Sequence, residues 1–401
     1  MQEQNALDSW IGTVSQYMPN LSKPQATVLA LWSFGIVMTR SCGLTSVAAF
    51  LALMLGQKEG TLRQRLREWY REAGAKAGEK RQALDVTCCF APLLRWVLSW
   101  WSAEERRLAL AMDASALGDR FVVLAISIVY RGCAIPVAWI LLSANQPGAW
   151  KPHWINLFEY LREAVPETWT VIVLADRGLY ARWLYTHIVS LGWHPFLRIN
   201  RQGKFRPVGT REFRSLSTVA PHVGTHWSGS VMCFKSHPLA CTLLACWEPG
   251  YATPWLILTD LTPAQADVCW YSLRTWIECG FKDNKRGGWQ WQQTRIMDPE
   301  RVTRFWLAIA VATLWVLSVG GEADATLPAS TLEALPATHI ARRRATQRSK
   351  PRLLSCFRRG CLVILAALLT HVPLPLGRFY PEPWPCNSQP VNVQLEIQYV
   401  H

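Results

Sequence analysis

The chain has 401 residues, a formal net charge of +14 and a sequence pI of about 9.4. Half of the residues are hydrophobic and only 17% are charged, which excludes disordered and fibrous proteins and fits roughly two or three globular domains. The 22 Trp, 10 Tyr and 13 Phe suit core packing as well as stacking on nucleic-acid bases, and composition alone does not separate these two uses.

The N-terminal residues show no basic stretch followed by an apolar one, so we expect no secretory signal and a cytoplasmic protein. The 12 cysteines are scattered without a CxxC pair, which predicts reduced thiols; a zinc site from Cys356, Cys361 and His339 or His371 would lack a second ligand pair. The longest apolar runs, 305–319 and 361–369, are shorter than the roughly 20 residues that span a membrane, so we expect buried helices and no membrane association.

Residues 1–100 are predicted to form a helical N-terminal domain. In the helix expected at 61–73, apolar side chains share one face and Arg63, Arg65 and Arg67 project elsewhere. Residues 58–81 contain 8 basic and 4 acidic residues. This pattern is typical of a helix-turn-helix-like DNA-binding module and equally of an amphipathic helix with a solvated basic face. We take Arg63, Arg65 and Arg67 as candidate DNA contacts.

Residues 101–200 predict the first part of an α/β core. Strand-like runs are followed by a helix, a very apolar strand, a second helix and a short strand, listed in order as 108–112, 121–129, 135–142, 153–165, 170–175, 179–191 and 195–199. Three antiparallel strands followed by strands parallel to the first are the order of a ribonuclease H-like core. The predicted fold is therefore α/β with a ribonuclease H-like core.

The remaining chain predicts three further parts. Residues 201–260 contain short alternating segments between Gly, Pro, Ser and His, typical of a β-rich insertion subdomain. Residues 261–320, with helices expected at 263–285 and 299–319, complete the core. Residues 321–401 form a basic, Pro-containing C-terminal region, and its arginines between 342 and 359 indicate either phosphate contacts or a solvated linker.

Three acids stand out by their context. Asp113 is expected to end the first strand and Asp176 the buried strand at 170–175, and ligands gather beyond the carboxyl ends of strands in open α/β sheets. Glu278 is expected on a helix, on one face with Tyr271 and Arg274, and Lys285 returns to that face if the helix continues through Gly280.

Three carboxylates held close together repel unless a cation compensates their charge. Hard oxygen ligands suit Mg²⁺ or Mn²⁺, and two such ions can activate the attacking oxygen and stabilise the leaving oxygen of a phosphodiester. Arg274 and Lys285 would then contact phosphate. The alternative for each acid alone is structural: Asp113 and Asp176 begin turns, and Glu278 pairs with Arg274 or Lys282 on a solvated helix.

The segment Tyr271, Arg274, Glu278 and Lys285 resembles the YREK signature of DDE transposases in the insertion-sequence family-four group, at the same spacing. Asp113 and Asp176 correspond to the first and second acids of that family, with 63 and 102 residues separating the three acids in turn. The resemblance covers about residues 106–320. Asp119 is a second acid near the first motif, but it falls in a predicted hairpin turn, so Asp113 is favoured.

The resemblance implies a transposase that binds the terminal inverted repeats of an insertion sequence and catalyses metal-dependent strand cleavage and transfer into target DNA, as a homodimer on double-stranded DNA. It implies Asp113, Asp176 and Glu278 as catalytic ligands of two Mg²⁺ or Mn²⁺ ions, and Tyr271, Arg274 and Lys285 as DNA contacts. The alternatives are a transposase-derived DNA-binding protein without cleavage activity and a structure-specific nuclease on the same core. Relatives often form hairpinned ends; the tryptophans 255, 276, 289 and 291 are either core residues or candidates to hold a flipped base.

Overall fold

The computed structural model describes residues 2–78, 82–145, 148–325 and 354–386. Its fold is mixed α/β, and the chain separates into two compact units. Within the described residues, unit 1 contains residues 2–169, 275–325 and 354–382, and unit 2 contains residues 170–274 and 383–386. Each unit is described by itself below.

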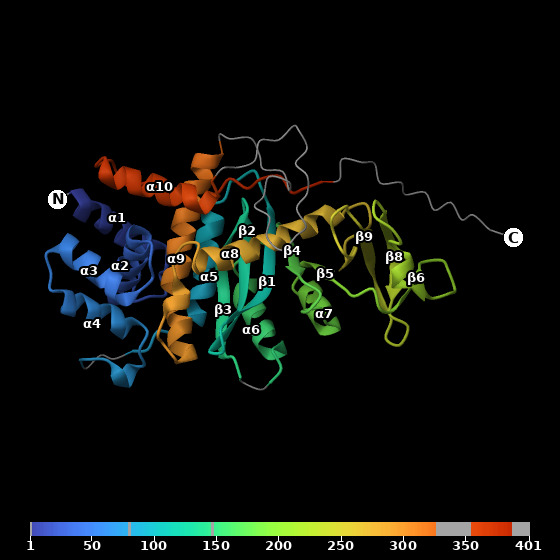
Figure 1. Ribbon diagram of the computed structural model, residues 1–401, viewed down its shortest axis with the longest axis horizontal. Helices are drawn as coiled ribbons and strands as arrows, with labels where there is room; N and C mark the ends of the chain where they lie inside the picture. Colours follow the sequence, from blue (N-terminus) through green and yellow to red (C-terminus); the bar gives the residue numbers. More distant parts are fainter. Residues whose placement is uncertain (1, 79–81, 146–147, 326–353, 387–401) are drawn as a thin grey trace. The chain divides into compact units, whose positions relative to one another are not determined.

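Unit 1 combines three strands with most of the helices (Figure 1). Its α-helices are α1 (Gln2–Tyr17), α2 (Lys23–Thr39), α3 (Leu44–Leu55), α4 (Glu59–Trp69), α5 (Thr87–Ser99), α6 (Lys151–Arg162), α8 (Trp276–Asn284), α9 (Pro299–Asp324) and α10 (Cys356–Leu369). Short 3₁₀ helices span Ala73–Ala75 and Trp291–Gln293. Its strands are β1 (Arg107–Leu117), β2 (Phe121–Tyr130) and β3 (Cys133–Ser143), which pair antiparallel in the order β3-β2-β1. The predicted three-stranded meander is therefore present.

The core of unit 1 is built around α9. This helix packs against β3, α2 and α10, and Figure 1 shows α1 to α4 on one side of it and the three strands on the other. It is long and apolar enough to cross a membrane, yet 94% of its apolar window is buried inside the structure, which is the behaviour of a core helix. Where α9 meets α10, a Cβ on Gly320 would lie 2.9 Å from the Gly360 nitrogen, so small residues are needed at this contact.

In the described part of residues 1–100 the long elements are the helices α1 to α5. These helices belong to the same compact unit as β1–β3, and a separate N-terminal domain stays a prediction. The predicted basic helix is α4, whose Leu62, Leu66 and Trp69 are buried as expected. Of the basic C-terminal tract, residues 342–352 lie outside the described residues, as does His339. Arg359 lies on α10 and pairs with Asp324 at 2.9 Å.

Unit 2 is a continuous sheet with one α-helix in its described part. The elements are β4 (Thr170–Ala175), α7 (Arg182–Ser190), β5 (His194–Arg198), β6 (Lys204–Pro207), β7 (Arg214–Ser215), β8 (His226–Cys233), β9 (Leu239–Cys246) and β10 (Trp255–Thr259), with 3₁₀ turns at Leu216–Thr218 and Val268–Thr275. The strand order is β4-β5-β10-β9-β8-β6-β7. β4 and β5 are parallel, as predicted, and β10 pairs antiparallel with β5. The β-rich segment 201–260 thus extends the sheet of β4 and β5.

The predicted helix at 263–285 differs from the structure. Residues 268–275 form a 3₁₀ helix, and the α-helix α8 begins only at Trp276. The Asp267 carboxylate accepts a hydrogen bond from the Cys269 amide at 2.8 Å, which starts the 3₁₀ turn. The continuous helical face expected from Tyr271 to Lys285 is therefore divided into two segments of different pitch.

Candidate active site

Asp113 lies in the interior of a long strand, which corrects the expectation that it ends one. β1 continues to Leu117, and Asp113 pairs with Ala125 of β2. Its half-buried carboxylate accepts a hydrogen bond from the Ala114 amide at 2.8 Å. Asp119 is exposed in the turn between β1 and β2, where Gly118 has a φ of 58°, as the hairpin prediction required.

Lys285 binds to the same strand. Its ammonium donates to the Ser115 hydroxyl at 2.9 Å and to the Ala116 carbonyl at 3.0 Å. Side chains two residues apart on a strand share a face, so Ser115 and Asp113 project from the same face of β1. Partial burial lowers the pKa of Lys285. Both of its acceptors, a hydroxyl and a backbone carbonyl, are uncharged. Lys285 therefore anchors the end of α8 on the strand that presents Asp113.

Glu278 occupies the first turn of α8 and is half-buried. The helix continues through Gly280, where a Cβ would lie 2.8 Å from the Ala134 Cβ of β3. The absence of a side chain thus allows α8 to approach β3 closely, which offsets the helix-weakening effect expected of glycine. Lys285 is the C-cap residue of this helix, one position beyond its end. An acid in the first turn is also favoured by the helix dipole.

Asp176 follows β4 in unit 2. One carboxylate oxygen accepts hydrogen bonds from the Gly178 amide at 2.8 Å and the Leu179 amide at 3.2 Å, which forms a turn closed by the side chain. The other oxygen lies 3.7 Å from the Arg274 guanidinium. The Asp176 side chain is 40% exposed and that of Arg274 is 12% exposed, so the acid remains open to solvent while the arginine is largely covered.

Tyr271 is buried inside unit 2. Its ring packs edge-on against Trp255 at 5.3 Å, and it is hydrogen-bonded to Arg198. Burial lowers the pKa of Arg198, with Tyr271 acting in the opposite direction. The structure thus gives Tyr271 a packing role, and its predicted contact with DNA stays a prediction.

The candidate residues divide between the two units. Asp113, Glu278 and Lys285 belong to unit 1, whereas Asp176, Arg274 and Tyr271 belong to unit 2. Within unit 1, α8 packs on β1, and within unit 2, Arg274 contacts Asp176.

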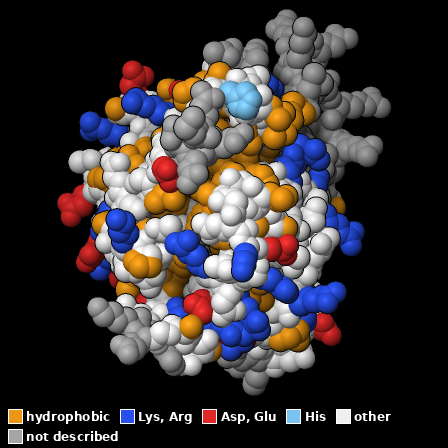
Figure 2. Space-filling view, turned by 90° about the vertical axis from the view of Figure 1, so that its left-hand side faces the viewer, with side chains coloured by type: hydrophobic (Ala, Val, Ile, Leu, Met, Phe, Trp, Pro, Cys, Tyr) orange, Lys and Arg blue, Asp and Glu red, His pale blue; other side chains and the backbone are white. Residues whose placement is uncertain are grey.

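A basic cavity of about 670 Å³ lies in unit 1. Arginines from α4, its C-terminal extension, the segment before α9 and the first turn of α9 line it together with hydroxyl residues at the start of α3: Arg63, Arg67, Arg71, Arg295, Arg301, Thr45 and Ser46. Among the described residues Arg65 is not part of this lining. Figure 2 views the molecule from the left-hand side of Figure 1, and on this face basic side chains are interspersed among apolar and acidic ones.

Glu72 holds one of the arginines of this cavity. Arg301 donates to the Glu72 carboxylate at 2.8 Å, and this hydrogen bond lowers the pKa of Glu72 to about 2. Arg304 also contacts Glu72, at 3.2 Å. Part of the positive charge at this end of the cavity is therefore neutralised within the protein, and the net attraction for an anion comes from the other arginines.

The four candidate tryptophans are buried. Trp255 and Trp276 are 7% and 8% exposed, and Trp289 and Trp291 are fully buried. Trp289 donates to the Thr313 hydroxyl of α9 at 2.9 Å, and Trp291 packs edge-on against Trp306 at 5.2 Å. These contacts favour the core interpretation over a role in holding a flipped base.

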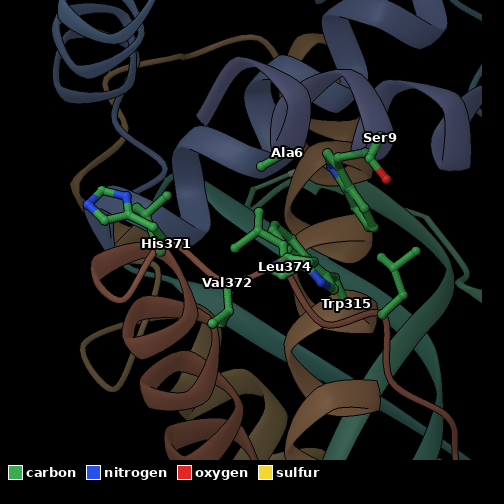
Figure 3. A pocket seen from close by; sticks show the side chains of 10 residues that line it. Ala6, Ser9, Trp315, His371, Val372 and Leu374 are labelled. Carbon is green, nitrogen blue, oxygen red and sulfur yellow. The ribbon is translucent and has the colours of Figure 1, made fainter. Parts of the chain in front are cut away.

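A second cavity in unit 1 is apolar and has a volume of about 250 Å³. Trp10, Trp315, Leu374 and further aliphatic residues line it, and Figure 3 shows Ser9 and His371 at its rim with Trp315 and Leu374 inside. This lining offers no set of charged groups for phosphoryl transfer. Cys356 and Cys361, for which the sequence favoured reduced thiols over a zinc site, are buried on α10, and the Cys356 thiol donates to the Leu317 carbonyl of α9.

No curated protein matches the sequence. Similar solved structures include a cryo-EM structure of the piggyBac transposase synaptic complex with hairpin DNA, at 12% identity and a TM-score of 0.40, with 82% of this chain and 75% of that chain covered. Residues 144–315 match the family model described as a transposase DDE domain. This segment, which contains Asp176, Arg274 and Glu278 and begins after Asp113, supports a DDE transposase.

Proposed function

We propose that this protein is a DNA transposase of the insertion-sequence family-four type, with a ribonuclease H-like core whose Asp113, Asp176 and Glu278 form one catalytic centre. The main support is that residues 144–315 match a transposase DDE domain and contain all four signature positions, Tyr271, Arg274, Glu278 and Lys285, at the family spacing. Further support is the antiparallel meander β1–β3 and the parallel pair β4 and β5.

The three acids suit divalent cations. Asp113 and Glu278 are half-buried, and Asp176 keeps one oxygen outside the turn that its other oxygen closes. Carboxylate oxygens are hard ligands of the kind that Mg²⁺ and Mn²⁺ prefer, and the cation would offset their mutual repulsion. When bound, two such ions would polarise the scissile phosphate and lower the pKa of the attacking hydroxyl.

The two basic residues of the signature would have different roles at the centre: Lys285 would contact the phosphate directly, and Arg274 would support the Asp176 carboxylate. Lys285 is held by the neutral acceptors Ser115 and Ala116, so its positive charge is available to a phosphate oxygen above the Asp113 face of β1. Arg274 contacts Asp176 at 3.7 Å and orients this carboxylate. Fixed positive groups that need no rearrangement stabilise the charge that develops during phosphoryl transfer.

DNA binding would use the basic cavity of unit 1. Arg63 and Arg67 lie one helical turn apart on α4, and Arg71 follows at the same spacing, which suits a row of phosphates. We propose that this cavity contacts the terminal inverted repeats, that a homodimer holds two ends, and that cut-and-paste transposition takes place on chromosomal DNA in the cytoplasm.

The test is cleavage of a labelled duplex that ends in the element's own inverted repeat, in the presence of Mg²⁺, Mn²⁺ or EDTA. We expect metal-dependent nicking at the repeat boundary that disappears in Glu278→Gln while binding of the same duplex is retained. Asp119→Asn, which changes the exposed acid of the hairpin turn, serves as the control and should cleave normally. Binding without cleavage under either metal would replace this proposal with a DNA-binding protein, and equal cleavage of DNA without the repeat would indicate a general nuclease.

A further inference from the structure

Three potential metal ligands lie together at one end of the β8–β9 hairpin in unit 2. His226 is the first residue of β8 and pairs directly with Cys246, the last residue of β9. Residues directly opposite on paired strands project to the same face, and Glu248, two positions beyond Cys246, continues this alternation. The register of the hairpin therefore brings an imidazole, a thiol and a carboxylate together from positions 22 residues apart in the sequence.

The separations between the donor atoms match the edges of a metal tetrahedron. The His226 Nε2 lies 3.8 Å from the Cys246 Sγ and 3.1 Å from a Glu248 carboxylate oxygen, and the sulfur lies 3.5 Å from that oxygen. Zinc bonds of about 2.3 Å to sulfur and about 2.0–2.2 Å to nitrogen and oxygen at tetrahedral angles give edges of about 3.6, 3.4 and 3.6 Å in the same order. The observed edges differ from these by a few tenths of an ångström.

The surroundings fix this cluster and leave it accessible. Cys246 is 3% exposed, whereas the side chains of His226 and Glu248 are each 27% exposed. The backbone beside it is closed by a hydrogen bond from the Trp247 amide to the Thr225 carbonyl at 3.0 Å. His226 also lines a cavity of about 490 Å³. The Cys246 thiol is therefore fixed by the surrounding protein, and an ion can reach it from the solvent-exposed side, where His226 and Glu248 lie.

We propose that His226, Cys246 and Glu248 bind Zn²⁺. Thiolate and imidazole ligands favour zinc over Mg²⁺, so this site differs in ligand chemistry from the three carboxylates of the proposed catalytic centre. Binding replaces the Cys246 thiol proton with a sulfur–zinc bond and releases one proton to solvent. Three protein ligands leave the fourth position to water or to a further ligand, and the ion joins the ends of β8 and β9.

The test measures metal binding by the full-length protein after chelator treatment and gel filtration. Zn²⁺ is titrated against a competing chromophoric chelator, and Co²⁺ is used as a probe because a cobalt–thiolate bond gives a charge-transfer absorption. Cys246→Ser and His226→Gln remove one ligand each. The matched controls are Cys241→Ser, on the same strand, and His237→Gln, an exposed histidine in the β8–β9 turn.

We expect one Zn²⁺ per chain, a cobalt–thiolate absorption that is lost in Cys246→Ser, and zinc binding weakened by more than about 10²-fold in both ligand variants, because outer partners of metal ligands alone change affinity by 10–100-fold. Both control variants should bind as the wild type does. Absence of the cobalt–thiolate absorption in the wild type, or equal zinc affinity in ligand and control variants, would overturn the proposal. The experiment measures Zn²⁺ binding and not DNA cleavage. A negative result would therefore reject the zinc site without bearing on the proposed Mg²⁺-dependent cleavage.

Discussion

The two basic residues of the signature are held in different ways. In unit 1, Lys285 donates to a hydroxyl and a backbone carbonyl of β1, which carry no charge. In unit 2, Arg274 lies 3.7 Å from the Asp176 carboxylate, and its side chain is only 12% exposed. A cation bound by neutral acceptors keeps its full charge for a ligand, whereas one beside a carboxylate is partly neutralised. The sequence predicts a phosphate contact for both residues. The structure gives them different partners, which indicates different roles.

The largest effect is expected from Asp176→Asn, which removes the charge next to Arg274. The asparagine carbonyl can still accept from the amides of Gly178 and Leu179, so the turn and the stability of the fold should be retained. Cleavage should fall by about 10³-fold or more, because a metal ligand contributes several kcal/mol of transition-state stabilisation. The loss is measured as the ratio of single-turnover cleavage rates of the variant and the wild type, and thermal unfolding checks that the stability of the variant is unchanged. A variant that unfolds more easily and cleaves at a normal rate would show that Asp176 only closes the turn.

Lys285→Met should lower the cleavage rate by about 10²-fold, because the variant keeps the aliphatic stem and loses the charge available to phosphate. Ser115→Ala removes one of its two acceptors while Ala116 remains, so its effect should be below about 10-fold. Both rates are measured on the same repeat-end duplex. Equal losses in the two variants would mean that Lys285 acts by anchoring α8 and not by contacting phosphate.

Arg67 and Arg65 extend the comparison to the basic cavity of unit 1. Arg67 lines the cavity and Arg65 does not belong to its lining among the described residues. In Arg67→Gln, the slope of log affinity for DNA against log salt should become shallower by about 1, and affinity at low salt should fall by up to about 10-fold. Arg65→Gln should change both by less. The measurement is fluorescence anisotropy of a labelled repeat at several salt concentrations, and a larger effect of Arg65 would reject the cavity as the DNA contact.

The smallest effect concerns Asp283 of α8, which is half-buried. Its partial removal from water raises the pKa of Asp283 from 3.8 to about 7. Between about pH 4 and pH 7 the folded chain thus binds more protons than the unfolded chain, so the contribution of this group to the free energy of unfolding falls as the pH rises. Asp283→Asn removes this slope and should gain at least about 1 kcal/mol relative to the wild type between pH 5 and pH 8. Denaturant unfolding at both pH values tests this, and parallel pH profiles would contradict it.

Local patterns predicted much of unit 1. The buried face of α4, the strands of the β1–β3 meander and the turn at Gly118 follow from periodicity and turn chemistry alone. The position of Asp113 was mispredicted because the half-buried residues 113–115 and the exposed Ala116 interrupt the buried run of β1 without ending the strand. Pairing with β2 extends that strand, and pairing is not visible in a single sequence.

Contacts between distant segments account for the rest. From the sequence alone, Gly280 is expected to lower the stability of its helix, yet it permits the close contact of α8 with Ala134 of β3. The cluster of His226, Cys246 and Glu248 depends on the register of the β8–β9 hairpin, and its ligands show no metal-binding spacing along the chain. The four tryptophans considered for stacking on bases are buried instead: Trp255, Trp276, Trp289 and Trp291. Their large apolar rings contribute to the packing of the core, and a single sequence does not distinguish this use from stacking on bases.

We propose that Asp113, Asp176 and Glu278 bind the same metal ions, and the most direct test maps the polypeptide around the bound ion. The DNA-bound protein is loaded with Fe²⁺ in place of Mg²⁺, and ascorbate with peroxide generates hydroxyl radicals that cut the chain near the iron. We predict cuts close to Asp113, Asp176 and Glu278 together, all suppressed by excess Mg²⁺ and in Glu278→Gln. Cuts confined to one unit, or unchanged in that variant, would contradict a shared centre.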